Sequence, residues 1–165
     1  MRRSVFPVFL AALVVAAAFI AATSSALPAR VASHFARGGE ANGWMTRESY
    51  GAFILGAALG SPLLVATLVA RLPRAFPGAV NLPNRAHWFA PERREATLAS
   101  LATFGWCFGA ALALLIAGVH WTVVAANART PPRLENGAIA ALLAAFALAL
   151  GIWLLAWYLR FRRPR

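Results

Sequence analysis

Four long apolar stretches constrain the fold of this chain more than any other feature. They run over about residues 5–26, 50–70, 98–124 and 137–158. Each reaches the roughly 20 mostly apolar residues that a helix needs to cross about 30 Å of hydrocarbon. Because backbone polar groups in lipid must be hydrogen-bonded internally, such spans are helices. The sequence therefore predicts an all-α, polytopic membrane protein with four transmembrane helices, forming a single membrane domain over residues 1–165.

The composition argues against a soluble domain and against nucleic-acid binding. Of the 165 residues, 61% are hydrophobic, and the formal net charge is +11. All 16 basic residues are arginines. Basic patches attract phosphate, but these arginines flank the apolar stretches instead of forming a stripe on a soluble face. The partner that this pattern predicts is the lipid bilayer, and no nucleic acid is expected.

The arginine distribution predicts the orientation, because cytoplasmic connections carry the excess of Arg and Lys. Eleven of the 16 arginines fall on one side, at positions 2, 3, 71, 74, 85, 93, 94, 160, 162, 163 and 165. The other five are at positions 30, 37, 47, 129 and 133. We therefore expect a multi-pass protein of the cytoplasmic membrane with both termini in the cytoplasm. Residues 27–49 and 125–136 would then lie outside.

The first apolar stretch has two interpretations. Arg2 and Arg3, the apolar run and the small residues at positions 24–26 resemble a signal peptide with a cleavage site. However, the run exceeds the roughly 7–15 residues of a signal core, and Pro28 would closely follow the cut. An uncleaved anchor is the favoured interpretation, while cleavage of residues 1–26 stays open.

The connection over residues 27–49 has the composition of a short folded extracytoplasmic cap, not of a flexible linker. Gly38-Gly39 and Asn42-Gly43 are strong turn signals, and Thr46 suits the N-cap of the second helix. On the other side, residues 71–97 are expected to form an inner interfacial elbow, in which Trp88 lies at the membrane interface.

The cap residues resemble a known family. The residues that carry the resemblance are Leu27, Pro28, Arg30, Val31, His34, Phe35, Gly38 or Gly39, Glu40, Asn42, Gly43 and Trp44. Their pattern is similar to the signature of the domain of unknown function 1648 family, a set of small bacterial integral membrane proteins. The resemblance covers about residues 5–70, and residues 81–95 resemble a segment of a four-span subgroup. Two departures are Ala32, where proline is common, and Asn42, where aspartate is common.

The resemblance also implies a class of function. Members of the family are sometimes joined to a module resembling the immunity protein against a secreted killing peptide, which implies a role in envelope defence or signal relay. This chain has no segment that matches the second module. We expect the cap to be the surface that binds a ligand or partner, through His34, Glu40, Asn42, Gly43 and Trp44.

Catalytic chemistry has little support in the sequence. There is no phosphate-binding glycine loop, HExxH, GxSxG or CxxC motif, so no catalytic residue and no cofactor are predicted. His34 and His120 are expected on the same side of the membrane. With Glu40 or Glu48 they could form a site of two histidines and one carboxylate for a divalent metal. The simpler interpretation of His120 is a hydrogen bond at the interface.

Small residues are expected to hold the helices together, because the hydrophobic effect does not drive association within lipid. The candidate packing residues are Gly56 and Gly60 in the second span and Gly105 and Gly109 in the third.

The sequence favours a binding, accessory or envelope-signalling protein, acting with a membrane-protein partner or as a homo-oligomer. A small transporter or oligomeric pore is the first alternative, and would need Ser61, Thr67, Thr103 and Asn127 to converge on one cavity. A metal-dependent membrane enzyme is the second.

Overall fold

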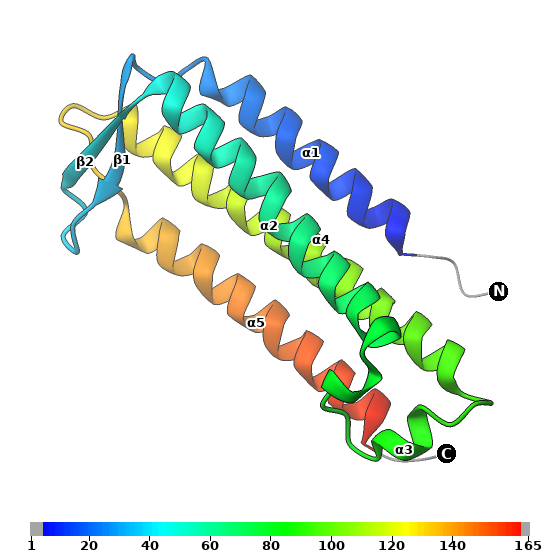
Figure 1. Cartoon of the computed structure of the whole chain (residues 1–165). Helices are drawn as coiled ribbons and strands as arrows, with labels where there is room; N and C mark the ends of the chain where they lie inside the picture. The colour runs from blue at the N-terminus through cyan, green and yellow to red at the C-terminus, as the bar shows by residue number, and fades with distance from the viewer. Residues whose placement is uncertain (1–4, 163–165) are drawn as a thin grey trace.

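The computed structural model describes residues 5–162, which form a helical bundle with a small β-hairpin at one end (Figure 1). The elements in chain order are α1 (Phe6–Ser24), β1 (Arg30–Phe35), β2 (Ala41–Thr46), α2 (Arg47–Ala75), the 3₁₀ turn η1 (Pro77–Ala79), α3 (Arg85–Trp88), α4 (Arg94–Asn127) and α5 (Asn136–Phe161). Helices α1, α2, α4 and α5 are each long and apolar enough to cross a membrane. The predicted fold class, a helical membrane protein with four spans, is confirmed.

The four long helices are not packed equally. Helices α1, α2 and α4 contact one another along their lengths, whereas α5 packs principally along α4 (Figure 1). The most apolar part of α5 has no buried residue. The bundle is therefore a three-helix core with a fourth helix attached at its side.

Two of the four predicted packing glycines make the close contacts expected of them. A Cβ atom added to Gly109 would lie 2.7 Å from Cε2 of Phe9 in α1 and 2.8 Å from Cβ of Ala66 in α2. A Cβ atom added to Gly105 would lie 3.0 Å from the Ala66 carbonyl oxygen. These positions let α1 and α2 approach the backbone of α4, as small residues do in membrane helix packing.

The prediction for Gly56 and Gly60 is wrong for packing within the chain. Both are exposed on α2, and at either position an added Cβ atom would meet nothing within 4 Å among the described residues. The reason is geometric: the buried stripe of α2 passes instead through Ile54, Ala58 and Ala66, which lie on another face of the helix.

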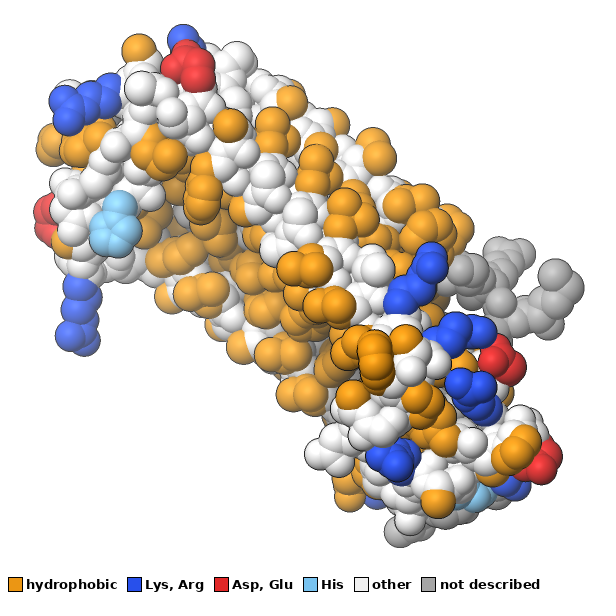
Figure 2. All heavy atoms as spheres, viewed as in Figure 1, with side chains coloured by type: hydrophobic (Ala, Val, Ile, Leu, Met, Phe, Trp, Pro, Cys, Tyr) orange, Lys and Arg blue, Asp and Glu red, His pale blue; other side chains and the backbone are white. Residues whose placement is uncertain are grey.

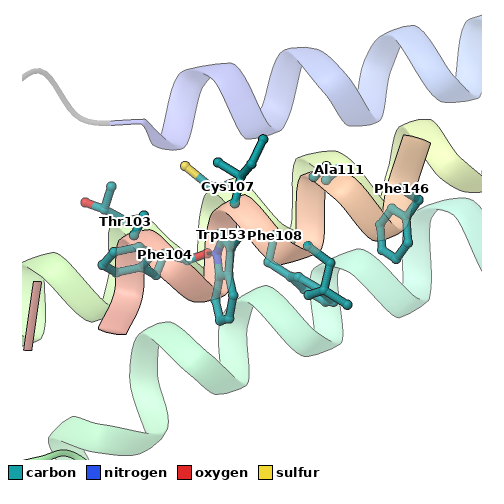
Figure 3. A pocket seen from close by; sticks show the side chains of 11 residues that line it. Thr103, Phe104, Cys107, Phe108, Ala111, Phe146 and Trp153 are labelled. Carbon is teal, nitrogen blue, oxygen red and sulfur yellow. Dashed lines mark hydrogen bonds between the residues drawn. The ribbon is translucent and has the colours of Figure 1, made fainter. Parts of the chain in front are cut away.

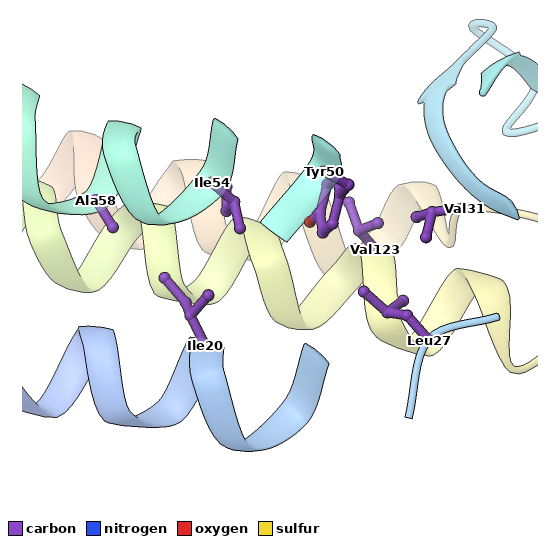
Figure 4. Close-up of a cluster of buried hydrophobic side chains, with 7 residues drawn as sticks. All are labelled: Ile20, Leu27, Val31, Tyr50, Ile54, Ala58 and Val123. Atoms are coloured by element: carbon purple, nitrogen blue, oxygen red, sulfur yellow. The ribbon is translucent and has the colours of Figure 1, made fainter. Parts of the chain in front are cut away.

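Helix α1 supplies side chains to both halves of the core. Near the hairpin, Ile20 packs in a cluster with Leu27, Val31, Tyr50, Ile54, Ala58 and Val123 (Figure 4). Further along the bundle, a second cluster contains Phe9, Leu13, Ala16, Ala66, Ala113 and Ala117. Helix α1 is thus packed against both halves of the bundle core.

On the face shown in Figure 2, charged side chains gather at the two ends of the bundle, and apolar side chains predominate on the surface between them. The hairpin and the loop 128–135 lie at one end, while α3 and the end of α5 lie at the other (Figure 1). Four arginines of the charge count, at positions 2, 3, 163 and 165, lie outside the described residues. The apolar middle is the surface that a bilayer would cover.

The elbow is shorter and more buried than expected. Helix α2 continues to Ala75 and α4 begins at Arg94. Trp88 is only 6% exposed, and its indole N–H donates to the carbonyl of Phe161 at 3.0 Å. Thr97 donates from its hydroxyl to the carbonyl of Trp88 at 2.8 Å. Trp88 therefore ties the elbow to the end of α5 through a buried side chain.

Candidate functional site

The cap is an antiparallel β-hairpin, which the sequence analysis did not predict. Strands β1 and β2 pair Arg30 with Thr46 and Ala32 with Trp44, and the register shifts on either side of His34. Beyond β2 the chain enters α2 directly. Thr46 is the N-cap, as expected, and its hydroxyl accepts a hydrogen bond from the backbone N–H of Ser49 at 3.2 Å. The hairpin is thus fixed to the first turn of a long helix.

Asn127, the last residue of α4, docks the hairpin onto the bundle. Its side-chain oxygen accepts a hydrogen bond from the N–H of Ala32 at 2.8 Å. Its side-chain nitrogen donates to the carbonyl of Ala32 at 3.0 Å and to the carbonyl of Val123 at 2.9 Å. The amide thereby pairs with β1 as a neighbouring strand would. Because Ala32 is fully buried, these bonds satisfy backbone groups that water does not reach.

The loop 128–135 between α4 and α5 holds the turn of the hairpin. The N–H of Leu134 donates to the carbonyl of Gly39 at 2.8 Å, and the guanidinium of Arg133 donates to the carbonyl of Gly38 at 3.0 Å. Arg133 also forms an ion pair with Glu40 at 3.2 Å. Gly39 has φ 89°, a conformation that favours glycine. The two connections at this end of the bundle therefore fold as one unit.

Three of the five predicted binding residues lie together on the hairpin. Nδ1 of His34 is hydrogen-bonded to Oδ1 of Asn42 at 2.5 Å. Gly43 lies opposite His34, and a Cβ atom added there would be 2.7 Å from Cβ of His34. Glycine at position 43 therefore gives the imidazole room to lie across the hairpin. His34 and Asn42 are both exposed.

The other two predicted residues, Glu40 and Trp44, line a separate hollow of about 200 Å³ together with Pro131, Pro132 and Arg133. The Trp44 side chain is 42% exposed, and the guanidinium of Arg30 lies 5.4 Å from its ring centroid. Glu40 is held by Arg133. The cap thus presents an imidazole–amide pair and an aromatic hollow, both accessible to a partner.

His120 lies apart from the cap residues, inside the helical bundle. Its Nε2 is hydrogen-bonded to the Thr23 hydroxyl of α1 at 2.8 Å, and its Nδ1 to the Tyr50 hydroxyl of α2 at 3.1 Å. The ring stacks on Tyr50, with centroids 5.8 Å apart. His120 is fully buried. The imidazole of α4 therefore links all three helices of the core through hydrogen bonds.

The metal site that the sequence allowed would use His34 and His120 as ligands. Both ring nitrogens of His120 have hydroxyl partners, and His34 is bonded to Asn42. Within residues 5–162 no group of three or more His, Cys, Asp or Glu is placed to hold a metal ion. The structure thus gives His34 and His120 separate hydrogen-bonding roles.

The polar residues considered for a pore bond locally. Ser61 and Thr103 donate to the carbonyls of Ala57 and Ala99 in their own helices. Thr67 is exposed, and Asn127 bonds to β1.

Sequence reasoning did not identify the roles of Asn127, Thr23 and Tyr50. The only signal was that each is polar and lies near the end of an apolar stretch.

Replacing His120 by leucine is expected to lower the free energy of unfolding by about 1–2 kcal/mol. Hydrogen bonds between membrane helices contribute about 0.6 kcal/mol each on average, and the substitution also leaves the Tyr50 hydroxyl unpaired. Tyr50→Phe, which removes one bond, should cost about 0.6 kcal/mol. Unfolding in mixed micelles measures both. Thr103→Val is the control, since its hydroxyl bonds within α4. An equal loss in all three variants would contradict the interhelical role.

One comparison with known proteins found a similarity over part of the chain. A family model described as a domain of unknown function (DUF1648) matches residues 9–59, which include most of α1, the whole hairpin and the start of α2. The resemblance expected from the cap residues is confirmed over this range, while the similarity expected at residues 81–95 stays a prediction. Neither the curated proteins nor the solved structures contain a match to the chain.

Proposed function

Because residues 9–59 are a DUF1648 segment whose hairpin is exposed at one end of the bundle, we propose that this protein binds a partner through its cap. The protein would act as an accessory or envelope-signalling component of the bacterial cytoplasmic membrane. Its partner would be another protein of the membrane or envelope. No bond-making chemistry is proposed, since the cap residues are suited to recognition.

The proposed orientation places the cap outside the cell and both termini in the cytoplasm. Among the described residues, the elbow end carries arginines at positions 71, 74, 85, 93, 94, 160 and 162, and the cap end carries those at 30, 37, 47, 129 and 133. The excess at the elbow end supports a cytoplasmic elbow.

The observation that carries the proposal is the rigid attachment of an exposed surface. Asn127 fixes β1 and Arg133 fixes the turn, so the cap does not need to become ordered when a partner binds. Preorganisation of this kind lowers the entropic cost of association. Trp44, at the edge of the hollow, is the residue type most enriched among binding hot spots.

A cysteine placed next to Trp44 tests both the binding surface and the orientation. The variant Arg30→Cys in a Cys107→Ser background would be treated, in intact cells of the native host, with a membrane-impermeant maleimide that carries a benzophenone. We expect labelling, and after illumination a covalent adduct with one envelope protein. Adding Trp44→Ala should reduce the adduct at least about fivefold, the effect of losing roughly 1 kcal/mol at a hot spot.

The control for orientation is Ala86→Cys, in the exposed part of the elbow, which should react only after the cells are permeabilised. Labelling of Ala86→Cys in intact cells, with none of Arg30→Cys, would overturn the proposed orientation. Labelling of Arg30→Cys without any specific adduct would overturn the binding function. An adduct with a second copy of the chain would instead identify the partner as the protein itself.

A further inference from the structure

The contact between α4 and α5 leaves an apolar groove of about 310 Å³. Its walls are formed by Phe104, Cys107 and Phe108 from α4 and by Phe146, Trp153 and Ala156 from α5 (Figure 3). The groove lies between two helices that are each long enough to span a membrane. The groove is separate from the cap, and its occupant does not depend on the function proposed for the cap.

The nitrogen and oxygen groups of the groove side chains are already hydrogen-bonded, and the one other heteroatom is the sulfur of the weakly polar Cys107 thiol. The indole N–H of Trp153 donates to the carbonyl of Phe104 at 2.9 Å, and the hydroxyl of Thr103 donates to the carbonyl of Ala99 at 2.9 Å. The walls therefore offer an occupant only apolar contact. A polar substrate that entered the groove would lose its hydrogen bonds to water without replacing them.

The size of the groove favours a narrow, flexible occupant. A helix is about 10 Å in diameter, so 310 Å³ would hold only about 4 Å of its length. A single hydrocarbon chain can follow such a groove because it has no backbone polar groups to satisfy. Within a bilayer, the molecule of this shape at the groove is a lipid.

An arginine marks the end of the groove nearest the elbow. Arg160 follows Ala156 by one turn of α5, and its guanidinium lies 3.4 Å from the hydroxyl of Ser100 in α4. The guanidinium also stacks over the ring of Trp88, at 4.8 Å from its centroid. These contacts hold a positive charge where the apolar walls end and the helices reach their polar flank. Guanidinium groups are well suited to phosphate.

We propose that the α4–α5 groove holds one acyl chain of an anionic phospholipid whose phosphate lies at Arg160. Selectivity comes from the headgroup, since a chain in the groove and a chain in the bilayer have similarly apolar surroundings. One arginine near the membrane surface favours an anionic headgroup about fivefold. The lipid would fill the gap that α5 leaves at the side of the three-helix core.

Photoreactive lipids test this proposal on the full chain. Protein reconstituted into vesicles would be illuminated with phosphatidylglycerol or phosphatidylcholine that carry the same diazirine in one acyl chain, and the adducts mapped by mass spectrometry. We expect adducts on residues 103–111 and 146–156 to be about fivefold more abundant with phosphatidylglycerol. Arg160→Ala should bring the two lipids to equal yield. Arg71→Ala, which removes an exposed arginine of α2, should leave the preference unchanged.

A second pair of variants tests the groove without changing any charge. Ala149→Phe fills it, because Ala149 is one of its lining residues, and should remove most groove adducts. Ala145→Phe, at an exposed position on the same helix outside the groove, is the matched control. Equal yields from both lipids with the native chain would overturn the proposal. So would groove adducts that persist in Ala149→Phe, or a groove covered by a second copy of the chain.

Discussion

Gly109→Leu is expected to disrupt the three-helix core and to lower the free energy of unfolding by about 3 kcal/mol or more. Even a Cβ atom at this position would lie 2.8 Å from Cβ of Ala66, which is fixed to the backbone of α2. Rotation of Phe9 alone therefore cannot relieve the clash, and α2 must move away from α4. Unfolding of the purified protein in mixed micelles, followed by far-UV circular dichroism, measures the loss.

Gly56→Leu is the matched control for this substitution. It makes the same chemical change on α2, where an added Cβ atom meets nothing within 4 Å. We expect a small stabilisation of about 0.5–1 kcal/mol, because glycine is unfavourable within a helix. A large loss of stability at Gly56 would show that this face of α2 is covered, for example by a second copy of the chain. Equal tolerance at both positions would contradict the packing described here.

Asn127→Ala is expected to release the cap from the bundle at a cost of about 2–4 kcal/mol. The substitution leaves the buried N–H and carbonyl of Ala32 without the partners that the side-chain amide provides. Hydrogen exchange measured by mass spectrometry should show the amides of residues 30–35 exchanging at least about 30-fold faster, since roughly 2 kcal/mol of protection is lost. The long helices should keep their protection.

The control is Asn136→Ala, which removes the same side chain from a nearby exposed position. Within residues 5–162 the Asn136 side chain makes one hydrogen bond, to the carbonyl of Arg37 at 3.0 Å. Exchange in the hairpin should then change only slightly, because water can replace an exposed partner. Similar exchange rates in the two variants would show that Asn127 does not hold the cap.

Different residues connect the elements at the two ends of the bundle. At the cap end, His120 and Asn127 connect α4 to α1, α2 and β1. At the elbow end, Trp88 and Arg160 connect the short α3 to the end of α5. Between these ends, α5 has few buried side chains. Variants of the α4–α5 groove should therefore affect lipid binding with little effect on the cap.

The class of the fold could be predicted from the sequence, because length and hydropathy alone decide whether a segment can cross hydrocarbon. The alternation of apolar spans and polar connections also placed residues 27–49 and 125–136 at the same end. Local turn chemistry identified Thr46 as the N-cap and marked the turn of the cap. These properties depend on neighbours in sequence, and so they can be predicted without knowing which helix packs against which.

Which polar and small residues contact one another depends on how the helices pack, and the sequence did not predict it. Gly56-x-x-x-Gly60 and Gly105-x-x-x-Gly109 have the same spacing, yet only the second pair faces other helices. Likewise, Asn127 contacts Ala32 and His120 contacts Thr23 from 95 and 97 residues away. Spacing along one helix fixes which residues share a face, but the rotation of that helix within the bundle depends on packing summed over all its neighbours. That sum decided which glycines are buried and gave the histidine of α4 its hydroxyl partners.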